Sequence, residues 1–183
     1  MTKTFETVSA AEVAHAGRAL PFWLSLSLIP SVLLAALVGG WAVALPPLAS
    51  WGMFTLLDRL TGRYEKNADL ETPDDRLLWY CAITLIWFPI QLALLFWLLW
   101  YVPTAEHLST FERVMVFFGI GVVSGTVGIN YAHELMHQSS RFERWLADLL
   151  LSTVLYGHFR SEHLLVHHTY VGTPRDAVTA RYN

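Results

Sequence analysis

The stretch LLWYCAITLIWFPIQLALLFWLLWYV, at residues 77–102, decides the fold class because it contains no charged residue. About 20 consecutive apolar residues are enough for a helix to cross the hydrocarbon core of a bilayer. The stretch is longer than a perpendicular crossing needs, so we expect the helix to tilt or to break near Pro89. Trp79, Trp97 and Trp100 lie near its ends, where tryptophan anchors helices at the membrane interface. The stretch therefore predicts a transmembrane helix.

Three further apolar runs accompany this one, at residues 19–38, 41–57 and 114–131. The run at 41–57 is short and carries two prolines, but Gly39 and Gly40 before it permit a tight hairpin back from the first run. The sequence therefore predicts an all-α integral membrane bundle with about four transmembrane helices. A bundle of three spans is the main alternative.

Polar segments flank the predicted bundle. Residues 1–18 mix both charge signs and lack the short basic start of a cleavable signal peptide, so we interpret the first apolar run as a retained span. Residues 132–183 follow the last run and hold most of the histidines. Within them, residues 141–155 are amphipathic and too short to span, which favours an interfacial or partly inserted helix.

The composition agrees with a membrane protein and excludes other classes. Hydrophobic residues make up 54% of the 183 residues and charged residues only 15%, whereas soluble domains carry about 25% charged residues. The net charge of −3 gives no basic field, so nucleic acid is excluded as a partner. A single cysteine, Cys81, rules out an intrachain disulfide or a cysteine-based metal site. Gly121 and Gly125 form a GxxxG spacing, which predicts close helix packing in lipid.

The distribution of basic residues predicts the orientation. With four spans, all of the twelve Lys and Arg residues except Arg113 fall on one side of the membrane. Cytoplasmic loops carry an excess of Lys and Arg, so the N-terminus and everything after Tyr131 should be cytoplasmic. Three spans would scatter these charges over both sides.

Five of the eight histidines fall in two short clusters. His133 and His137 are four residues apart, and so are His163 and His167. Residues four apart lie on one face of a helix, so each pair can reach one metal ion. His168 should point about 100° further around the helix, toward a second position or a neighbouring metal. Ionisable residues beside membrane helices tend to mark function, and the two clusters together predict a metal site.

The other three histidines are weaker candidates. His15 and His107 stand alone in polar segments and are interpreted as surface residues. His158 lies five residues before the second cluster and could support it, carry protons or end a helix.

The ligand type narrows the choice of metal. Neutral imidazole binds zinc, copper, iron and nickel, and five imidazoles exceed the four ligands of a structural zinc site. Iron with open positions for O₂ fits a site beside lipid. The sequence HELMH also matches the HExxH pattern of zinc proteases, with Glu134 as the general base, but that alternative leaves the second histidine cluster unexplained.

Five motifs carry a resemblance to a known family. The segment NYAHELMHQ and the following RFERWLADLLLSTVLYGHFRSEHLLVHHTYVGTPRDAVTAR contain a HELxH box, a basic-aromatic helix, a YGHF segment, an EHxxxHH box and a TPxDxxxxR tail. LLDRLTGRYEKN, at residues 56–67, matches the segment after the family's second span. In this order the motifs resemble the bacterial alkane monooxygenases, membrane relatives of the fatty-acid desaturases. The resemblance covers residues 56–183, and the first helix agrees only in hydropathy.

The resemblance implies an enzyme of the bacterial inner membrane with two non-haem irons on the cytoplasmic side. His133, His137, His163, His167 and His168 match its iron ligands. It implies activation of O₂ and insertion of one oxygen atom into a C–H bond of an alkane, while the other leaves as water. Electrons would come from rubredoxin and an NAD(P)H-dependent reductase.

Acidic residues beside the boxes are candidates for orienting the rings, as metal-bound histidines require. They are Glu134, Glu162 and Asp176. Near the inner end of the second span, Trp51, Met53 and Phe54 are candidates for limiting the chain length of the substrate, or for plain helix packing.

The chain departs from the family pattern in three places. It stops at Asn183, before the family's third histidine box, so we expect this fragment alone to be inactive and unable to hold both irons. Val166 occupies a position where glycine is common, and Gln138 replaces a common lysine. A related desaturase or hydroxylase, an intramembrane zinc protease and a non-catalytic membrane fragment are the alternative functions.

Overall fold

The computed structural model describes residues 19–61 and 77–176. The N-terminal segment 1–18, with His15, and residues 177–183 lie outside the described residues. Every regular element in the described ranges is a helix. The all-α fold predicted from the hydropathy pattern is therefore confirmed.

Four helical segments are long and apolar enough to cross a membrane, and they confirm the four-span count over the three-span alternative. They are Ala19–Val38, Gly40–Leu60, Leu78–Thr104 and Thr110–Met136. The first contains η1 (Leu24–Ser27) and α2 (Leu28–Val38); the second contains η2 (Gly40–Ala44), α3 (Leu45–Pro47), η3 (Leu48–Met53) and α4 (Phe54–Thr61). The third is α5 (Leu78–Thr104), and the fourth contains α6 (Thr110–Val123), η5 (Ser124–Gly128) and α7 (Ile129–Met136).

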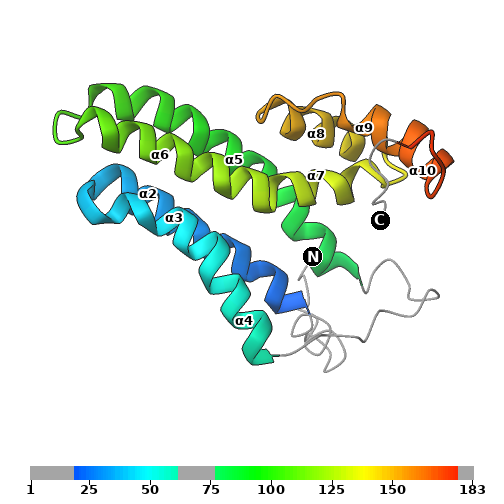
Figure 1. Ribbon diagram of the computed structural model, residues 1–183, viewed down its shortest axis with the longest axis horizontal. Coiled ribbons are helices and arrows are strands. Elements are labelled where there is room, and N and C mark those ends of the chain that lie inside the picture. Colours follow the sequence, from blue (N-terminus) through cyan, green and yellow to red (C-terminus); the bar gives the residue numbers. More distant parts are fainter. Residues whose placement is uncertain (1–18, 62–76, 177–183) are drawn as a thin grey trace, which may run out of the picture.

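Two helical hairpins lie side by side and form the bundle (Figure 1). Both tight turns, one after α2 and one after α5, lie at the same end of the bundle. The opposite end holds the start of the first span, the end of α4, the start of α5 and the end of α7. The histidine-rich region is therefore attached to the end that lies away from the two tight turns.

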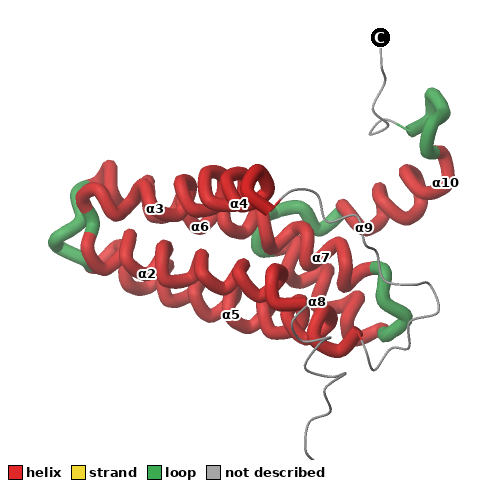
Figure 2. Tube along the Cα trace, turned by 90° about the horizontal axis from the view of Figure 1, so that it is seen from below, coloured by secondary structure: helices red, strands yellow, loops and turns green. Residues whose placement is uncertain are grey.

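Short helices continue the chain beyond the bundle. They are α8 (Arg141–Ser152), α9 (Phe159–Ser161), η6 (Glu162–His167) and α10 (His168–Tyr170). Helix α8 runs back beside α7, and the side chains of Leu146, Ala147, Leu150 and Leu151 are buried. Figure 2 shows α9 and α10 standing off the end of the bundle.

Helix α5 passes through Pro89 without interruption. Proline removes one backbone hydrogen bond, but the helix remains continuous because its neighbours bury one face around Trp87, Leu94 and Leu98. The break near Pro89 that the sequence analysis allowed is absent, so tilt is the remaining way to fit the length to a bilayer.

The fourth span begins four residues earlier than hydropathy indicates. Ser109 caps the helix with its side chain, and the carboxylate of Glu112 accepts a hydrogen bond from the Ser109 backbone N–H at 2.7 Å. This capping box starts the helix at Thr110, before the apolar run begins at Val114. A hydropathy pattern does not register this capping signal.

Glycines pack helices together, but not at the predicted pair. A Cβ atom added to Gly121 or Gly125 would meet nothing within 4 Å among the described residues. A Cβ on Gly119 would lie 3.0 Å from Pro46, and one on Gly128 would lie 2.3 Å from the Oε1 atom of Gln91. The GxxxG prediction was therefore wrong, and the close contacts lie at Gly119 and Gly128.

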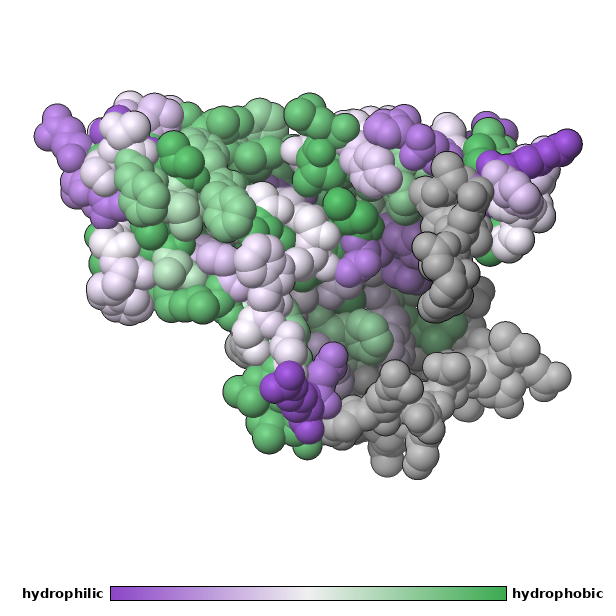
Figure 3. Space-filling model, in the orientation of Figure 1, coloured by the Kyte–Doolittle hydropathy of each residue, from purple (hydrophilic) through white to green (hydrophobic). Residues whose placement is uncertain are grey.

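The flank of the bundle visible in Figure 3 is largely apolar, and hydrophilic residues gather toward its ends. Large apolar side chains on several spans are exposed, among them Leu37, Trp41, Phe96, Trp100 and Phe118. A soluble protein rarely exposes so large an apolar surface. The chain is a multi-pass membrane protein.

One prediction concerns the first hairpin turn. Gly39 has φ 66° and a Cβ there would lie 2.8 Å from Leu108, so Gly39→Ala adds both backbone strain and a clash. We expect Gly39→Ala to destabilise the detergent-solubilised protein by more than about 1 kcal/mol. Thermal unfolding followed by circular dichroism measures this. Gly121→Ala is the matched control, and equal unfolding temperatures for the two variants would contradict the assignment.

Candidate metal centre

The first histidine pair lies at the end of the fourth span. α7 follows the π-helical turn η5 and carries His133, and His137 is the residue that ends the helix. Tyr131, on the same helix, is buried and donates a hydrogen bond from its hydroxyl to Ser25 Oγ at 2.8 Å. The helix that presents the histidines is thus fixed to the first span.

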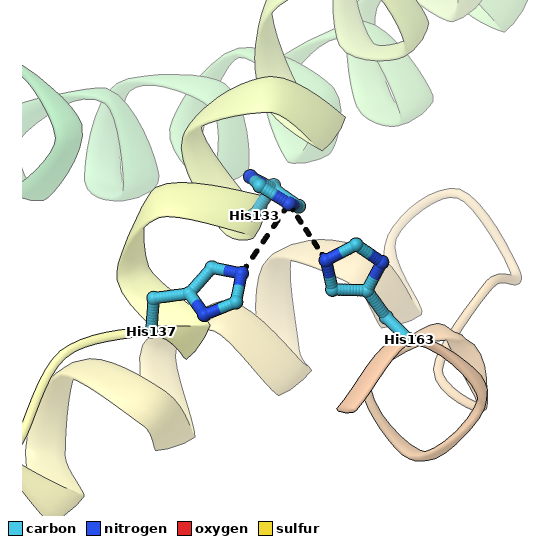
Figure 4. Close-up of side chains that lie close together, drawn as sticks. All are labelled: His133, His137 and His163. Carbon is cyan, nitrogen blue, oxygen red and sulfur yellow. Dashed lines mark hydrogen bonds between the residues drawn. The ribbon is translucent and has the colours of Figure 1, made fainter. Parts of the chain in front are cut away.

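Four of the five predicted ligands form a closed group of rings. The Nε2 atom of His133 lies 2.8 Å from that of His163 and 3.3 Å from that of His137 (Figure 4). His168 completes the group, with its Nε2 atom 2.9 Å from that of His163 and its ring centroid 5.0 Å from that of His137. We call His133, His137, His163 and His168 the histidine quartet.

His168 joins the quartet because the second box is not a regular α-helix. Residues Glu162–His167 form the π-helical turn η6. A π-turn bonds residue i to i+5 and so winds less per residue than an α-helix. Residue 168 is therefore brought back toward the face of His163. His168 therefore lies beside His163 while His167 points toward Asp176, which agrees with the second position that the sequence analysis allowed for His168.

His167 is directed differently from the quartet. Its Nδ1 atom lies 2.8 Å from the Oδ2 atom of Asp176, whose side chain is fully buried. A carboxylate that accepts the Nδ1 hydrogen leaves Nε2 as the metal-binding nitrogen. The ring also stacks on His163 with centroids 5.4 Å apart. Asp176 thus occupies the orienting position that the sequence analysis suggested for it.

The other candidate supporting residues differ in their placement. Glu134 has its Oε1 atom 3.4 Å from His133 Nδ1, within reach for orienting that ring. Glu162 instead faces His158, with Oε2 3.8 Å from Nε2, and both side chains are largely exposed. His158 also contacts Tyr156 edge to face. Neither Glu162 nor His158 joins the quartet.

Phe159 is a site residue that the sequence analysis did not single out. Its ring stacks on His163, with centroids 5.1 Å apart, and lies 6.4 Å from His133. It covers the quartet on one side and limits the rotation of both rings. Its place in the YGHF segment, directly before the second box, was the available signal.

The two residues that differ from the family pattern, Gln138 and Val166, have mild local roles. The side chain of Gln138 donates a hydrogen bond from Nε2 to the Glu134 carbonyl at 3.2 Å and extends the end of α7. Val166 lies within η6, and 36% of its surface is exposed. Neither side chain enters the quartet.

Two rings of the quartet, His137 and His163, have lowered pKa values. Partial burial and then the neighbouring rings of His133 and His168 lower the pKa of His163 to about 4. The same causes, burial first, lower the pKa of His137 from its usual value. Imidazoles that stay neutral at pH 7 keep a nitrogen lone pair for a metal.

The spacing of the nitrogen atoms fits a bound ion. Two imidazole nitrogens that bind one ion at about 2.1 Å lie about 3.0–3.4 Å apart. The separations of 2.8 Å between His133 and His163 and 3.3 Å between His133 and His137 are close to that range. One ligand atom from each of His133, His137 and His163 lies within 4.8 Å of the others. All of these ligand atoms are imidazole nitrogens, and imidazole favours transition metals over calcium or magnesium.

A cavity adjoins the site along α7. It has a volume of about 710 Å³ and reaches from Phe22, Phe54 and Ile83 to Val127 and Glu134. Glu134 borders the cavity and contacts His133, so the cavity approaches the quartet at this residue. Of the residues suggested to limit chain length, Phe54 lines the cavity, whereas Trp51 packs against Phe118 and is not part of the wall. The side chain of Met53 lies outside the described residues.

Comparison with known proteins supports the resemblance that the motifs indicated. The family model "Fatty acid desaturase" matches residues 113–183. The chain is 37% identical to alkane 1-monooxygenase 1 of Pseudomonas aeruginosa, over 78% of this chain and 38% of the relative. It is 36% identical to the alkane 1-monooxygenase of Pseudomonas putida, over 73% of this chain and 34% of the relative. Over 35% of this chain and 17% of the relative, it is 48% identical to alkane 1-monooxygenase 2 of Alcanivorax borkumensis.

We predict that the quartet binds a transition metal. Removal of the central ring in His163→Ala should weaken binding of Co²⁺ at least about tenfold, because three of the measured ring contacts are lost. His158→Ala is the matched control from the same segment and should bind as the parent does. Titration of the metal-free protein, followed by the visible bands of bound cobalt, measures both. Equal losses in the two variants would contradict the assignment.

Proposed function

We propose that this chain belongs to the alkane monooxygenase family and forms part of a membrane enzyme that hydroxylates alkanes. The chain spans little more than a third of the length of the curated relatives it matches. The observation that carries the proposal is the convergence of two distant histidine clusters at one end of a membrane bundle.

The metal we propose is non-haem iron, two ions in the complete enzyme, with O₂ as co-substrate. His133, His137 and His163 would hold one ion, and His168 and His167 would offer their Nε2 atoms beside it. Bound iron would supply the activation of O₂ and the insertion of one oxygen atom into a C–H bond. Asp176 and Glu134 orient the rings of His167 and His133, and Phe159 limits the rotation of His163.

The cavity beside α7 is suited to an apolar chain. Its walls include Phe22, Phe54, Ile83 and Val127, and its polar residues include Glu134, next to His133. Apolar walls position a hydrocarbon by shape and exclude water, while the metal supplies the bond chemistry. Large apolar side chains are exposed on the spans, and we propose that a hydrocarbon dissolved in lipid enters the cavity laterally between them.

For the cellular setting we propose the bacterial inner membrane, with the quartet on the cytoplasmic side. The concentration of Lys and Arg on one side supports this orientation. Residues 1–18, 19–131 and 132–183 would then be the cytoplasmic N-terminal segment, the transmembrane helices and the histidine-box region. A rubredoxin-type donor, reduced by an NAD(P)H-dependent reductase, would deliver the electrons at this face.

A zinc protease is the second candidate because HELMH presents two histidines and Glu134 on one helix. A protease of this kind needs the glutamate as general base, so Glu134→Gln would abolish peptide cleavage. The geometry favours the monooxygenase, since His163 and His168 from the second box complete the same group of rings.

Product analysis tests the proposed reaction. Membranes containing the complete enzyme of which this chain forms part, supplied with rubredoxin, its reductase, NADH and O₂, should convert octane to octanol. His133→Ala should abolish the product because a ring of the quartet is lost. Formation of a desaturated acyl lipid with octane left unchanged would instead assign the chain to a desaturase.

Chain-length preference tests the role of the cavity. Phe54→Ala enlarges the cavity, and we expect it to raise the ratio of kcat/KM for long over short alkanes by about tenfold. Trp51→Ala, on the same span but outside the wall, is the control and should leave the ratio unchanged. An equal change in both variants would show that general loosening of the second span, and not cavity size, sets the preference.

A further inference from the structure

Gln91 forms a buried polar contact in the middle of the bundle, away from the histidine quartet. Gln91 lies halfway along α5 and is 1% exposed. Its Oε1 atom accepts a hydrogen bond from Trp87 Nε1 at 2.8 Å, and its Nε2 atom donates to Thr153 Oγ1 at 2.9 Å. Polar side chains in a membrane bundle are costly unless they are paired, so this amide has a specific partner set. We call Trp87, Gln91, Thr153 and Gly128 the Gln91 clasp.

Gly128 belongs to the clasp because the Gln91 amide rests directly on its backbone. A Cβ atom on Gly128 would lie 2.3 Å from Gln91 Oε1 and 3.2 Å from its Nε2 atom. Only glycine leaves room for the amide at this place. Gly128 is the last residue of the π-helical turn η5, directly before α7.

The π-turn sets the rotation of the helix that carries the first histidine box. Because a π-turn bonds i to i+5, it inserts one extra residue into the helix. Everything after it is rotated by the angular step of one residue, about 100°, relative to a regular α-helix. Without η5, His133 and His137 would turn away from the face that meets His163.

We propose that the Gln91 clasp is a positioning device that holds η5 as a π-turn and thereby aims His133 and His137 at the second histidine box. Gln91 and Gly128 are positioning residues and touch no ring of the quartet. The clasp also binds the end of α8 through Thr153, and Trp87 packs edge to face on Tyr131, two residues before His133. It therefore joins α5, α7 and α8, the helices around the first box.

The test compares two glycines of the same π-turn. Gly128→Ala forces the Gln91 amide out of place, whereas Gly125→Ala meets nothing within 4 Å. Both variants gain the same helix propensity. We expect Gly128→Ala to bind Co²⁺ about tenfold more weakly than the parent, and Gly125→Ala to bind as the parent does. The double variant Gly128→Ala with Gln91→Asn, in which a shorter amide gives back the space, should recover part of the loss.

A second readout does not depend on metal. In the metal-free protein with Cys81→Ser, the pair His133→Cys and His163→Cys should be joined by a short bis-methanethiosulfonate cross-linker, which forms a disulfide with each thiol and releases sulfinate. We expect the cross-linked fraction to fall in the Gly128→Ala background and to persist in the Gly125→Ala background. The proposal rests on the proposed metal site only for the cobalt readout. If the protein with His133→Cys and His163→Cys cross-links while the protein with all its histidines binds no cobalt, the metal proposal fails and the positioning proposal stands.

A milder substitution distinguishes an effect on folding from an effect on the positions of the histidines. Thr153→Val keeps the shape of the side chain and removes the hydroxyl that accepts the Gln91 hydrogen bond. We expect it to lower cross-linking while the helical circular dichroism stays unchanged. Parent-like cross-linking and cobalt binding in both Gly128→Ala and Thr153→Val would overturn the proposal.

Discussion

The contact between His133 and His163 joins two parts of the chain that are 30 residues apart in sequence. One ring comes from the end of a membrane span and the other from a π-turn that stands beyond the bundle. Two imidazole rings at this distance gain little by themselves. A shared metal ion would convert their proximity into strong bonds, so the geometry of the region is understandable chiefly as a metal site.

The bundle and the clasp serve this contact. Lipid leaves backbone groups no water to bond, which forces the spans to be helical and makes them rigid supports. The rigid support still has to present its histidines at the right angle. The extra residue in η5 rotates α7, and Phe159 and Asp176 hold the rings from the other segment. The site is therefore assembled from a rotated span on one side and short, oriented helices on the other.

Much of this could be predicted from sequence because the signals were local. Runs of apolar residues gave four spans, and HxxxH spacing identified the two segments that meet. The π-turns could not be predicted from hydrophobic periodicity, and the contact that we propose to hold η5 joins Gln91 and Gly128, far apart in the chain. The glycine prediction failed for a similar reason: the close helix contacts lie at Gly119 and Gly128, not at Gly121 and Gly125. The role of Phe159 likewise depends on distant partners, whereas the Ser109–Glu112 capping box is a local S-x-x-E signal that hydropathy does not include.

The most direct test of the central claim is the X-ray absorption spectrum of the iron-loaded protein in membranes or detergent. The account predicts a first shell dominated by nitrogen at about 2.0–2.2 Å, with the multiple-scattering pattern of at least three imidazole rings. The imidazole signal should fall in His163→Ala. An oxygen-dominated shell, or a spectrum that does not change in His163→Ala, would contradict the claim that the two histidine boxes hold one metal centre.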